Sequence, residues 1–256
     1  MNCFVFVTVR TASSRLPKKA LLEINGKPLI RIIVERISQI TSSKKIVVCT
    51  TNLKSDDKLA RILKKHKINV FRGSSKDILD RLYRAARKYN VKQFIVVEGD
   101  DFFCDLDLMK KTCRELIKSD YEFLVWSNLP FGVSPLGIKT DKLQQLIESK
   151  SIKNTETGWG RFIVKSGFFK VGSLEPKNKK LIRPDIRLSI DYPEDFQLIK
   201  KIYENLPRKF SLRYIIDLLD KNPEWLKINE SVKKKYKENF EKKMAKIALR
   251  KKEVRK

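Results

Sequence analysis

The stretch from Phe4 to Lys19 reads FVFVTVRTASSRLPKK and joins an apolar run directly to a basic one. In Phe4–Val9, valine alternates with phenylalanine and threonine, and this pattern of β-branched and aromatic residues predicts a buried strand. The next segment, residues 10–19, holds four cations and three hydroxyl groups. Ligands of open α/β sheets bind beyond the carboxyl ends of the strands, so we expect a binding site at this loop.

The chemistry of the loop suits a polyphosphate. Arginine forks, lysine charges and free backbone N–H groups match its many acceptor oxygens and its negative charge. Neither common phosphate motif is present: there is no G-x-G-x-x-G, and Gly26-Lys27 lacks the upstream glycine of a P-loop and precedes Pro28. A basic surface loop without a ligand is the alternative interpretation.

Strands and helices alternate through the first half of the chain. Apolar runs predict further buried strands, and 3.6-residue periodicity predicts amphipathic helices between them. Strand, helix, strand in this order predicts an α/β fold with a doubly wound, mainly parallel sheet. The expected strands are 46–50, 70–71 and 94–97, and the expected helices are 28–40, 56–65 and 77–89.

The second half is less regular. We interpret residues 127–175, which are rich in glycine, serine and proline, as a small insertion that forms a lid or an acceptor-side wall. Around it we expect helices at 106–117, 141–148, 193–202 and 211–219, and strands at 123–126 and 187–190. One domain, residues 1–226, therefore precedes a lysine-rich tail, residues 227–256.

The tail keeps a thin apolar stripe at helical spacing: Tyr236, Phe240, Met244 and Ile247. We expect an exposed basic helix that is docked by this stripe or pairs two subunits as a homodimer. We also expect it to lie apart from the active site.

The formal net charge of +27 indicates either an anionic partner or a general lysine bias. We favour the bias, because lysines are scattered along every segment, and we expect no specific nucleic-acid partner. No apolar run of about 18 residues predicts a membrane span, and no signal-peptide layout precedes the first strand, so we expect a cytoplasmic protein. The single histidine and the four widely spaced cysteines (3, 49, 104 and 113) predict reduced thiols, with neither a zinc site nor a disulfide framework.

Acidic side chains follow two of the predicted strands. Glu98-Gly99-Asp100-Asp101 follows the strand at 94–97, and Asp191 ends the strand at 187–190. Carboxylates at strand exits suit a hard divalent cation that holds phosphates, with a polar helix-capping loop as the alternative. Glu194 and Asp195 fall in the first turn of a helix, where the macrodipole favours them, so we expect them to be structural.

Four stretches together resemble one enzyme family. Residues 10–21, RTASSRLPKKAL, resemble the pattern A-R-x-x-S-x-R-L-P-G-K-x-L of the cytidylyltransferases that activate acidic sugars. These are the acylneuraminate and deoxy-octulosonate types and, most closely, the spore-coat-polysaccharide type. Residues 71–81, 98–100 and 187–195 resemble the family's R-G-x-x-x-D-V-L-D-R, T/Q-G-D and R-L-T-V-D-T-P-E-D in the same order. Lys18 stands where the family has glycine, which adds charge and stiffens the loop.

The resemblance implies a Rossmann-like nucleotidyltransferase that joins CMP from CTP to a small anionic acceptor, an acidic sugar or a phosphate or phosphonate, and releases pyrophosphate. It implies a role in cell-surface glycan or polymer biosynthesis and Mg²⁺ (magnesium) as the cofactor. The implied catalytic residues are Arg10, Arg15 and Lys19, and the implied metal ligands are Asp100 and Asp191. The nucleotide-binding candidates are Ser13, Ser14, Arg72, Ser74, Asp77 and Arg81.

The resemblance thins between Asn128 and Leu174, the region that faces the acceptor in the family. Glu156-Thr157 lies where spore-coat relatives show E-H, and the histidine is absent. Cationic and aromatic side chains in this region suggest an anionic acceptor. The acceptor-binding candidates are Lys139, Trp159 and Arg161.

Two other functions fit parts of this pattern. A glycosyltransferase that uses a ready-made nucleotide sugar shares the strand-exit carboxylates but does not need the loop of residues 10–19. A non-catalytic nucleic-acid-binding protein fits the charge, but the clustered acidic residues disfavour it.

Overall fold

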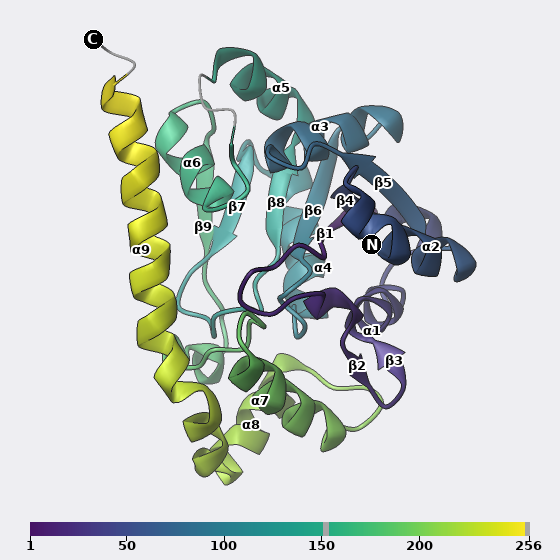
Figure 1. Cartoon of the computed structure of the whole chain (residues 1–256), viewed down its shortest axis with the longest axis vertical. Coiled ribbons are helices and arrows are strands. Elements are labelled where there is room, and N and C mark those ends of the chain that lie inside the picture. Colours follow the sequence, from purple (N-terminus) through teal and green to yellow (C-terminus); the bar gives the residue numbers. More distant parts are fainter. Residues whose placement is uncertain (151–153, 254–256) are drawn as a thin grey trace.

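β1 (Phe4–Thr8) lies at the centre of the molecule (Figure 1). The structure is a computed structural model that describes residues 1–150 and 154–253, with side chains as far as Lys242. Within these residues the strands form a seven-stranded sheet in the order β5-β4-β1-β6-β8-β7-β9. β1 lies between β4 (Ile46–Thr51) and β6 (Gln93–Glu98), and β5 (Asn69–Gly73) lies on the far side of β4. Beyond β6 lie β7 (Phe123–Trp126), β8 (Leu136–Lys139) and β9 (Val171–Leu174).

The predicted parallel half of the sheet is confirmed. β1 pairs in parallel with β4 and with β6, and β4 pairs in parallel with β5. Val5 and Val7 pack into the core on one face of the sheet, and Phe6 packs into the core on the other face. The alternation in β1 therefore reflects burial on both faces.

The other half of the sheet contains antiparallel pairs. β8 is antiparallel to β6 and to β7, and β9 is parallel to β7. The segment 127–175 thus supplies two strands that the sequence did not predict, β8 and β9. A Cβ atom on Gly137 in β8 would lie 2.9 Å from Thr112 Cγ2, so α4 packs directly on this strand.

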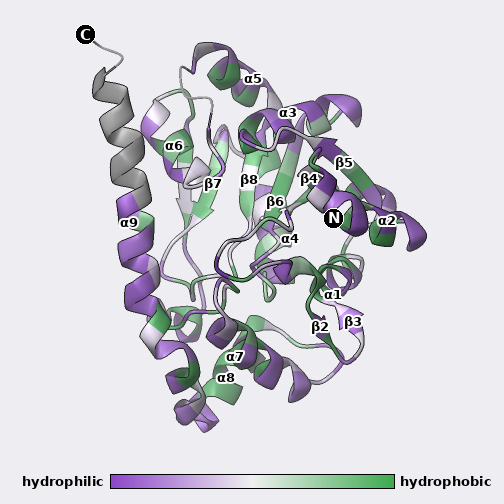
Figure 2. Ribbon diagram, in the orientation of Figure 1, coloured by the Kyte–Doolittle hydropathy of each residue, from purple (hydrophilic) through white to green (hydrophobic). Residues whose placement is uncertain are grey.

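Helices cover both faces of the sheet, as a doubly wound fold requires, and the strands between them are mostly hydrophobic (Figure 2). One core lies under α1 (Leu29–Ile37), α2 (Asp57–Lys65), α4 (Leu106–Lys118), α7 (Pro193–Glu204) and α8 (Leu212–Lys221). The other lies under α3 (Ile78–Lys88), α5 (Thr140–Ser149) and α6 (Trp159–Ser166). A hairpin joins β2 (Glu23–Ile24) to β3 (Lys27–Pro28). The short 3₁₀ turns are η1 (Lys19–Leu21), η2 (Ser43–Lys45), η3 (Lys54–Asp56), η4 (Lys179–Leu181) and η5 (Pro223–Asn229).

The strand predicted at 187–190 is wrong, because Arg187 makes only an isolated bridge to Phe131. The segment is extended, but its backbone groups bond to two different loops. Leu188 N donates to Phe131 O at 2.7 Å, and Ile190 N donates to Asp100 O at 2.9 Å. No single partner strand runs along it, yet the second of these bonds holds Asp191 beside the end of β6.

The predicted tail helix is present as α9 (Glu230–Glu253), a largely hydrophilic helix that runs along the side of the molecule (Figures 1 and 2). The side chains of Met244 and Ile247, the second half of the predicted stripe, lie outside the described residues. No helix in the described ranges is both long and apolar enough to cross a membrane.

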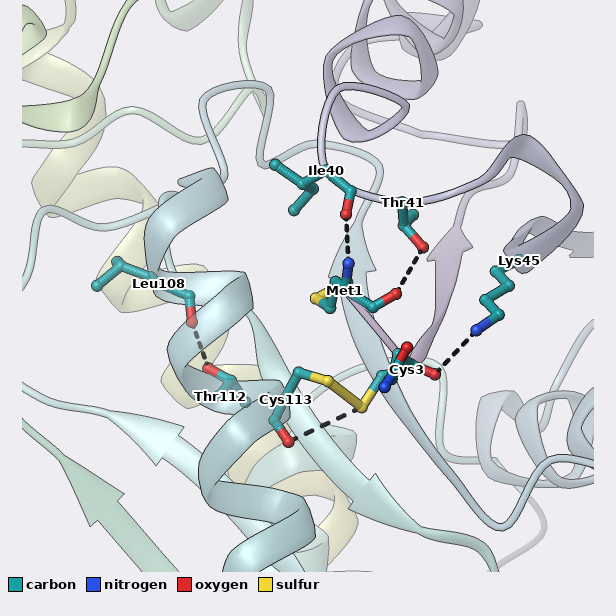
Figure 3. Close-up of a disulfide and its surroundings, with 9 residues drawn as sticks. Met1, Cys3, Ile40, Thr41, Lys45, Leu108, Thr112 and Cys113 are labelled. Atoms are coloured by element: carbon teal, nitrogen blue, oxygen red, sulfur yellow. Dashed lines mark hydrogen bonds between the residues drawn. A yellow bond between two sulfur atoms is a disulfide. The ribbon is translucent and has the colours of Figure 1, made fainter.

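The prediction of reduced thiols is wrong for one pair of cysteines. Cys3, just before β1, forms a disulfide with Cys113 of α4 (Figure 3). The two residues lie 110 positions apart in the sequence, and their pairing depends on α4 covering the start of β1. Cys49 and Cys104 are free and buried.

Candidate active site

The loop after β1 is anchored at its start by a buried carboxylate. Asp56 is fully buried, and its Oδ1 accepts a hydrogen bond of 2.8 Å from Thr11 N. Its Oδ2 accepts from Thr50 Oγ1 and Thr51 N, at the end of β4. Burial would raise the pKa of Asp56, but hydrogen bonds from Thr11, Thr51 and Thr50 lower it below its usual value. Asp56 thus fixes the loop to the neighbouring strand.

Lys18 explains how the loop turns back toward the sheet. Its φ of 57° and ψ of 25° are left-handed, and its N–H donates to Thr11 O at 3.1 Å. Glycine adopts this conformation without strain, whereas an L side chain does not. The turn leads straight into η1, which begins at Lys19.

Lys19 lies between two carboxylates from distant parts of the chain. Its Nζ is 2.7 Å from Asp100 Oδ2, 3.2 Å from Asp191 Oδ1 and 2.9 Å from Ile190 O. Burial lowers the pKa of the Lys19 amine, but the charges of Asp100 and Asp191 outweigh this effect and raise it. The amine is therefore a fixed positive charge at the exit of β1.

Asp191 is surrounded by cations. Arg15 Nη2 donates to its Oδ1 at 2.5 Å, and Arg187 Nη2 donates to its Oδ2 at 2.9 Å. Burial would raise the pKa of Asp191, but the charges of Lys19, Arg15 and Arg187 lower it to about 2. Asp191 therefore stays ionised and holds Arg15 and Lys19 at one place.

A buried hydrogen-bond network centred on Asp195 holds the backbone of Asp191 in place. Asp195 accepts two hydrogen bonds from Arg187 and one of 2.9 Å from Asn229 Nδ2. It also accepts from the backbone N–H groups of Asp191 and Tyr192 at 3.0 and 3.1 Å. Asp195 is fully buried, as a structural residue would be.

Glu98, at the end of β6, carries a perturbed carboxyl group. Burial, and then the charge of Asp100, raise the pKa of Glu98 to about 7, although a hydrogen bond of 2.8 Å from Trp159 Nε1 opposes the shift. Burial, and then the charge of Asp100, also raise the pKa of Asp101. Carboxyl groups are therefore crowded around Asp100.

Arg10 and Arg81 share one carboxylate. Glu156 Oε2 lies 3.4 Å from Arg10 Nη1, and its Oε1 lies 3.0 Å from Arg81 Nη1. Arg81 is almost completely buried on α3 and also donates to Ser74 O at 2.6 Å. Arg10, with an exposed side-chain fraction of 40%, is the accessible member of this group.

These residues surround a cavity of about 420 Å³. Arg10, Ser13, Ser14, Arg15 and Lys19 line it from the β1 loop. Glu98 and Asp100 line it from the end of β6, and Asp191, Trp159 and Arg161 line it from the second half of the chain. The structure thus gathers the basic loop and both strand-exit carboxylates around one space.

The expectation that the tail lies apart from the site is wrong. Tyr236 and Phe240 of α9 line the same cavity as Lys19. The Tyr236 ring lies over Arg187, 4.2 Å from the guanidinium carbon to the ring centroid, and 5.6 Å from the guanidinium carbon of Arg15. The tail helix is part of the site.

Comparison with known proteins identifies the family. A family model described as cytidylyltransferase matches residues 4–160, which include the whole β1 loop and Asp100. The chain belongs to the cytidylyltransferase family. It is therefore a nucleotidyltransferase, which favours nucleotide transfer over glycosyl transfer and over simple nucleic-acid binding.

Two relatives and one solved structure extend the match beyond residue 160. An uncharacterised protein of Methanocaldococcus jannaschii is 33% identical over 241 residues, which is 92% of this chain and 97% of the relative. Spore coat polysaccharide biosynthesis protein SpsF of Bacillus subtilis is 26% identical over 235 residues, which is 88% of this chain and 97% of the relative. The structure of a cytidylyltransferase from Leptospira borgpetersenii superposes with a TM-score of 0.80 at 24% identity, over 88% of this chain and 97% of that one. The last comparison shows the shared fold.

Four predicted site residues of this cytidylyltransferase do not line the cavity. Arg72 donates to Thr51 O and Leu53 O, and Lys139 donates to Ser119 O. Ser74 Oγ accepts from the N–H groups of Lys76 and Asp77 in the turn before α3. Asp77 caps α3 by accepting from Asp80 N at 3.2 Å and also accepts from Thr155 Oγ1. Ser74 and Asp77 therefore make local capping contacts. Arg72 and Lys139 bind backbone carbonyl groups outside the cavity.

Sequence reasoning did not assign site roles to several residues that shape the cavity: Asp56, Glu98, Glu156, Arg187, Tyr236 and Phe240. The signal for Arg187 was present, since it opens the RLSIDYPED stretch. The Tyr236–Phe240 spacing was noted as a docking stripe, but nothing in it indicates which surface the stripe covers. In the sequence Asp56 has the position of an ordinary helix-start aspartate, and only the structure shows that it contacts Thr11.

The donor set of the site fits a hard divalent cation. Oxygens of Asp100 and Asp191 converge on a single positive group, the Lys19 amine. No group of three or more acidic, cysteine or histidine side chains suited to a metal occurs in the described part of the chain. Magnesium commonly uses one or two protein carboxylates and completes its shell with water and substrate phosphates, which matches this pair.

Proposed function

We propose that this cytidylyltransferase transfers CMP from CTP to a small anionic acceptor and releases pyrophosphate. One observation carries the proposal: Lys19 pairs with Asp100 and Asp191 at the base of the loop that also presents Arg10 and Arg15 to the cavity. Cations and oxygen ligands at one place are what a nucleoside triphosphate requires. The name of the Bacillus subtilis relative supports a role in polysaccharide biosynthesis. A requirement for CTP would suit the cytoplasmic location that we propose.

The chain's own residues would act by position and charge. Arg10, Arg15 and Lys19 would bind the phosphate oxygens and stabilise the negative charge that develops on the departing pyrophosphate. Asp191 would hold Arg15 and Lys19 in place, since it contacts both side chains. Ser13 and Ser14 add hydroxyl groups on the same side of the cavity.

Asp100 and Asp191 would hold the Mg²⁺ ion that we propose as the cofactor. When bound, such an ion polarises phosphoryl oxygens and lowers the pKa of an acceptor hydroxyl group. The crowding of Glu98 and Asp101 around Asp100 supports this proposal. Burial and then the charge of Asp100 raise their pKa values, and added positive charge would offset the second of these effects.

The test is a pyrophosphate-release assay with purified protein and Mg²⁺. Each of CTP, UTP, ATP and GTP is offered with a panel of an ulosonic acid, a uronic acid, a sugar phosphate and a phosphonate. We expect release with CTP and one member of the panel, and at least about tenfold less with each other nucleotide, because a mismatched base leaves buried groups unpaired at roughly 1–3 kcal/mol each.

Two outcomes would count against parts of the proposal. Equal use of UTP, or preference for a purine, would overturn CTP as the substrate and leave nucleotide transfer intact. Release with neutral sugars alone would overturn the anionic acceptor.

A further inference from the structure

α9 is held against the cavity by specific contacts. Val232 is buried, and Lys233 Nζ donates to Asp185 O at 2.8 Å. Six residues further along the helix, Asn239 Nδ2 donates to the hydroxyl group of Tyr192 at 3.0 Å. Figure 1 shows the helix continuing beside α6, and an Arg161–Phe240 contact confirms this neighbourhood. These contacts fix the face of α9 that meets the cavity.

That face carries two nearly parallel aromatic rings. The Tyr236 and Phe240 ring centroids are 6.0 Å apart, and their planes differ by 16°. Both residues line the cavity, and both remain partly accessible. They form a flat apolar wall on the side of the cavity where α6 and α9 meet, and such a wall suits the C–H face of a ring.

Arg161 lies beside this wall, and no carboxylate among the described side chains pairs with it. The other cavity cations each have one: Arg10 and Arg81 share Glu156, Arg15 has Asp191, and Lys19 has two. The recorded contact of Arg161 is with the Phe240 ring, 4.8 Å from the guanidinium carbon to the centroid. Among the described cavity residues, its guanidinium is therefore the cation available for an incoming anion.

The topology places the Phe240 and Arg161 end of this wall on other elements than those that carry the phosphate loop. The carboxyl ends of β1 and β6 meet at the switch point of the parallel half, where Thr8 pairs with Glu98. The phosphate loop leaves from β1 there, and α3 covers the neighbouring part of the cavity with Ile78 and Arg81. Phe240 and Arg161 come from α9 and α6, which belong to the second half of the chain. With the nucleotide bound at the phosphate loop, as the proposed function requires, the second region would be left for the acceptor.

We infer that Phe240 and Arg161 form the acceptor-selecting subsite, with Tyr236 continuing its apolar wall. The acceptor class is a small anion with an apolar C–H face: its carboxylate, phosphate or phosphonate pairs with Arg161, and its body packs on Phe240. This inference rests on the proposed function. It also replaces two earlier candidates, since Lys139 lies outside the cavity and the Trp159 indole N–H is bonded to Glu98.

The test uses the full chain and the four-member acceptor panel described above. Phe240→Leu removes the ring and keeps apolar volume, whereas Phe240→Tyr keeps the ring. Arg161→Gln removes the charge, and Lys165→Gln removes a charge one helical turn away, outside the cavity lining. For each variant, the KM for the reactive panel member is measured by pyrophosphate release, and the Kd for CTP is measured by calorimetry without acceptor.

We expect Phe240→Leu and Arg161→Gln to raise the acceptor KM at least tenfold and to leave the CTP Kd within twofold. Phe240→Tyr, which keeps the ring, should raise the acceptor KM less than Phe240→Leu does, and Lys165→Gln should match wild type in both quantities. Unchanged acceptor KM in the first two variants, or a rise in the CTP Kd instead, would overturn the subsite while nucleotide transfer stands. A wild-type chain that binds CTP but releases no pyrophosphate with any panel member would overturn the proposed acceptor class, and this inference with it.

Discussion

The Arg187 guanidinium and the Asp195 carboxylate form two parallel hydrogen bonds, Nε to Oδ1 at 2.9 Å and Nη2 to Oδ2 at 3.0 Å. Both side chains are buried, and Asp195 also accepts hydrogen bonds from the backbone N–H groups of Asp191 and Tyr192. The position of Asp191 in the cavity therefore depends on a pair of residues that do not themselves line it.

Breaking this pair should destabilise the protein strongly. We predict that Asp195→Asn lowers the free energy of unfolding by about 3–5 kcal/mol in urea denaturation, because it leaves a buried guanidinium short of charge compensation. Asp217→Asn is the matched control, since Arg213 Nε donates to both oxygens of Asp217 at 2.7 and 2.8 Å on the surface. Asp217→Asn should lower the free energy of unfolding by no more than about 1 kcal/mol. Similar losses in the two variants would show that burial adds nothing to the Arg187 pair.

The two strand-exit carboxylates should be essential for turnover. We predict that Asp100→Asn and Asp191→Asn each lower kcat at least about a hundredfold, the scale of losing a preorganised charge contact. Asp100→Asn should keep the stability of wild type, because its side chain is partly exposed. Asp191→Asn should also lose stability, because Asp191 is buried and holds three cations. Wild-type rates at saturating magnesium in both variants would remove these residues from the mechanism.

Glu98 should make stability fall as pH rises. The unfolded chain loses this proton near pH 4.3, whereas the folded protein keeps it to about pH 7. Between these values the folded state binds more protons, so the free energy of unfolding decreases with pH. Glu98→Gln lacks this titration. Its stability relative to wild type, measured by urea denaturation in EDTA, should rise by roughly 1–3 kcal/mol between pH 4 and pH 8. A difference that is independent of pH would contradict the shift.

The ring of Tyr236 should contribute to CTP binding because it contacts the guanidinium groups of Arg15 and Arg187. We predict that Tyr236→Ala weakens CTP binding about fivefold in calorimetry, the scale of one cation–π contact of about 1 kcal/mol. Tyr236→Phe keeps the ring over Arg15 and Arg187 and should bind CTP as wild type does. Equal weakening by both substitutions would point to the hydroxyl group instead.

Lys18 should be a site where glycine is preferred. Its left-handed backbone costs an L residue about 1 kcal/mol, and glycine escapes this cost. We therefore predict that Lys18→Gly unfolds at a higher temperature than Lys18→Ala, which lacks the charge but keeps the strain. The reverse order in thermal denaturation would show that the loop takes another conformation in solution.

The parallel half of the fold was predictable because its signals are local. Val5, Phe6 and Val7 alternate between two buried faces, and a strand of this kind can be recognised from its own residues. β8 could not be recognised in this way, since it is short, contains Gly137 and follows a proline. Its pairing with β6 depends on α4 packing directly against that glycine.

The site residues likewise fall into those that have a local sequence signal and those that do not. The positions of Lys19 and Asp100 followed from strand exits and from the family motifs. That of Asp191 followed from its motif alone, because the strand expected before it is absent. Arg72, Ser74 and Asp77 belong to a family motif too, but hydrogen bonds to nearby residues occupy them, and a motif does not reveal such local partners. Phe240 and Cys113 act through residues far away in the sequence, Arg161 and Cys3, so neither role has a local signal.

The arrangement of α9 also has a consequence for the order in which the enzyme becomes competent during synthesis. Chains emerge from the ribosome with the N-terminal side first, and folding can begin there. β1, β4, β5 and β6 carry the phosphate loop and Asp100, and they can assemble long before Tyr236 and Phe240 have been translated. A nascent chain can therefore form the phosphate loop while the aromatic wall is still missing, and the complete cavity arises only when α9 docks.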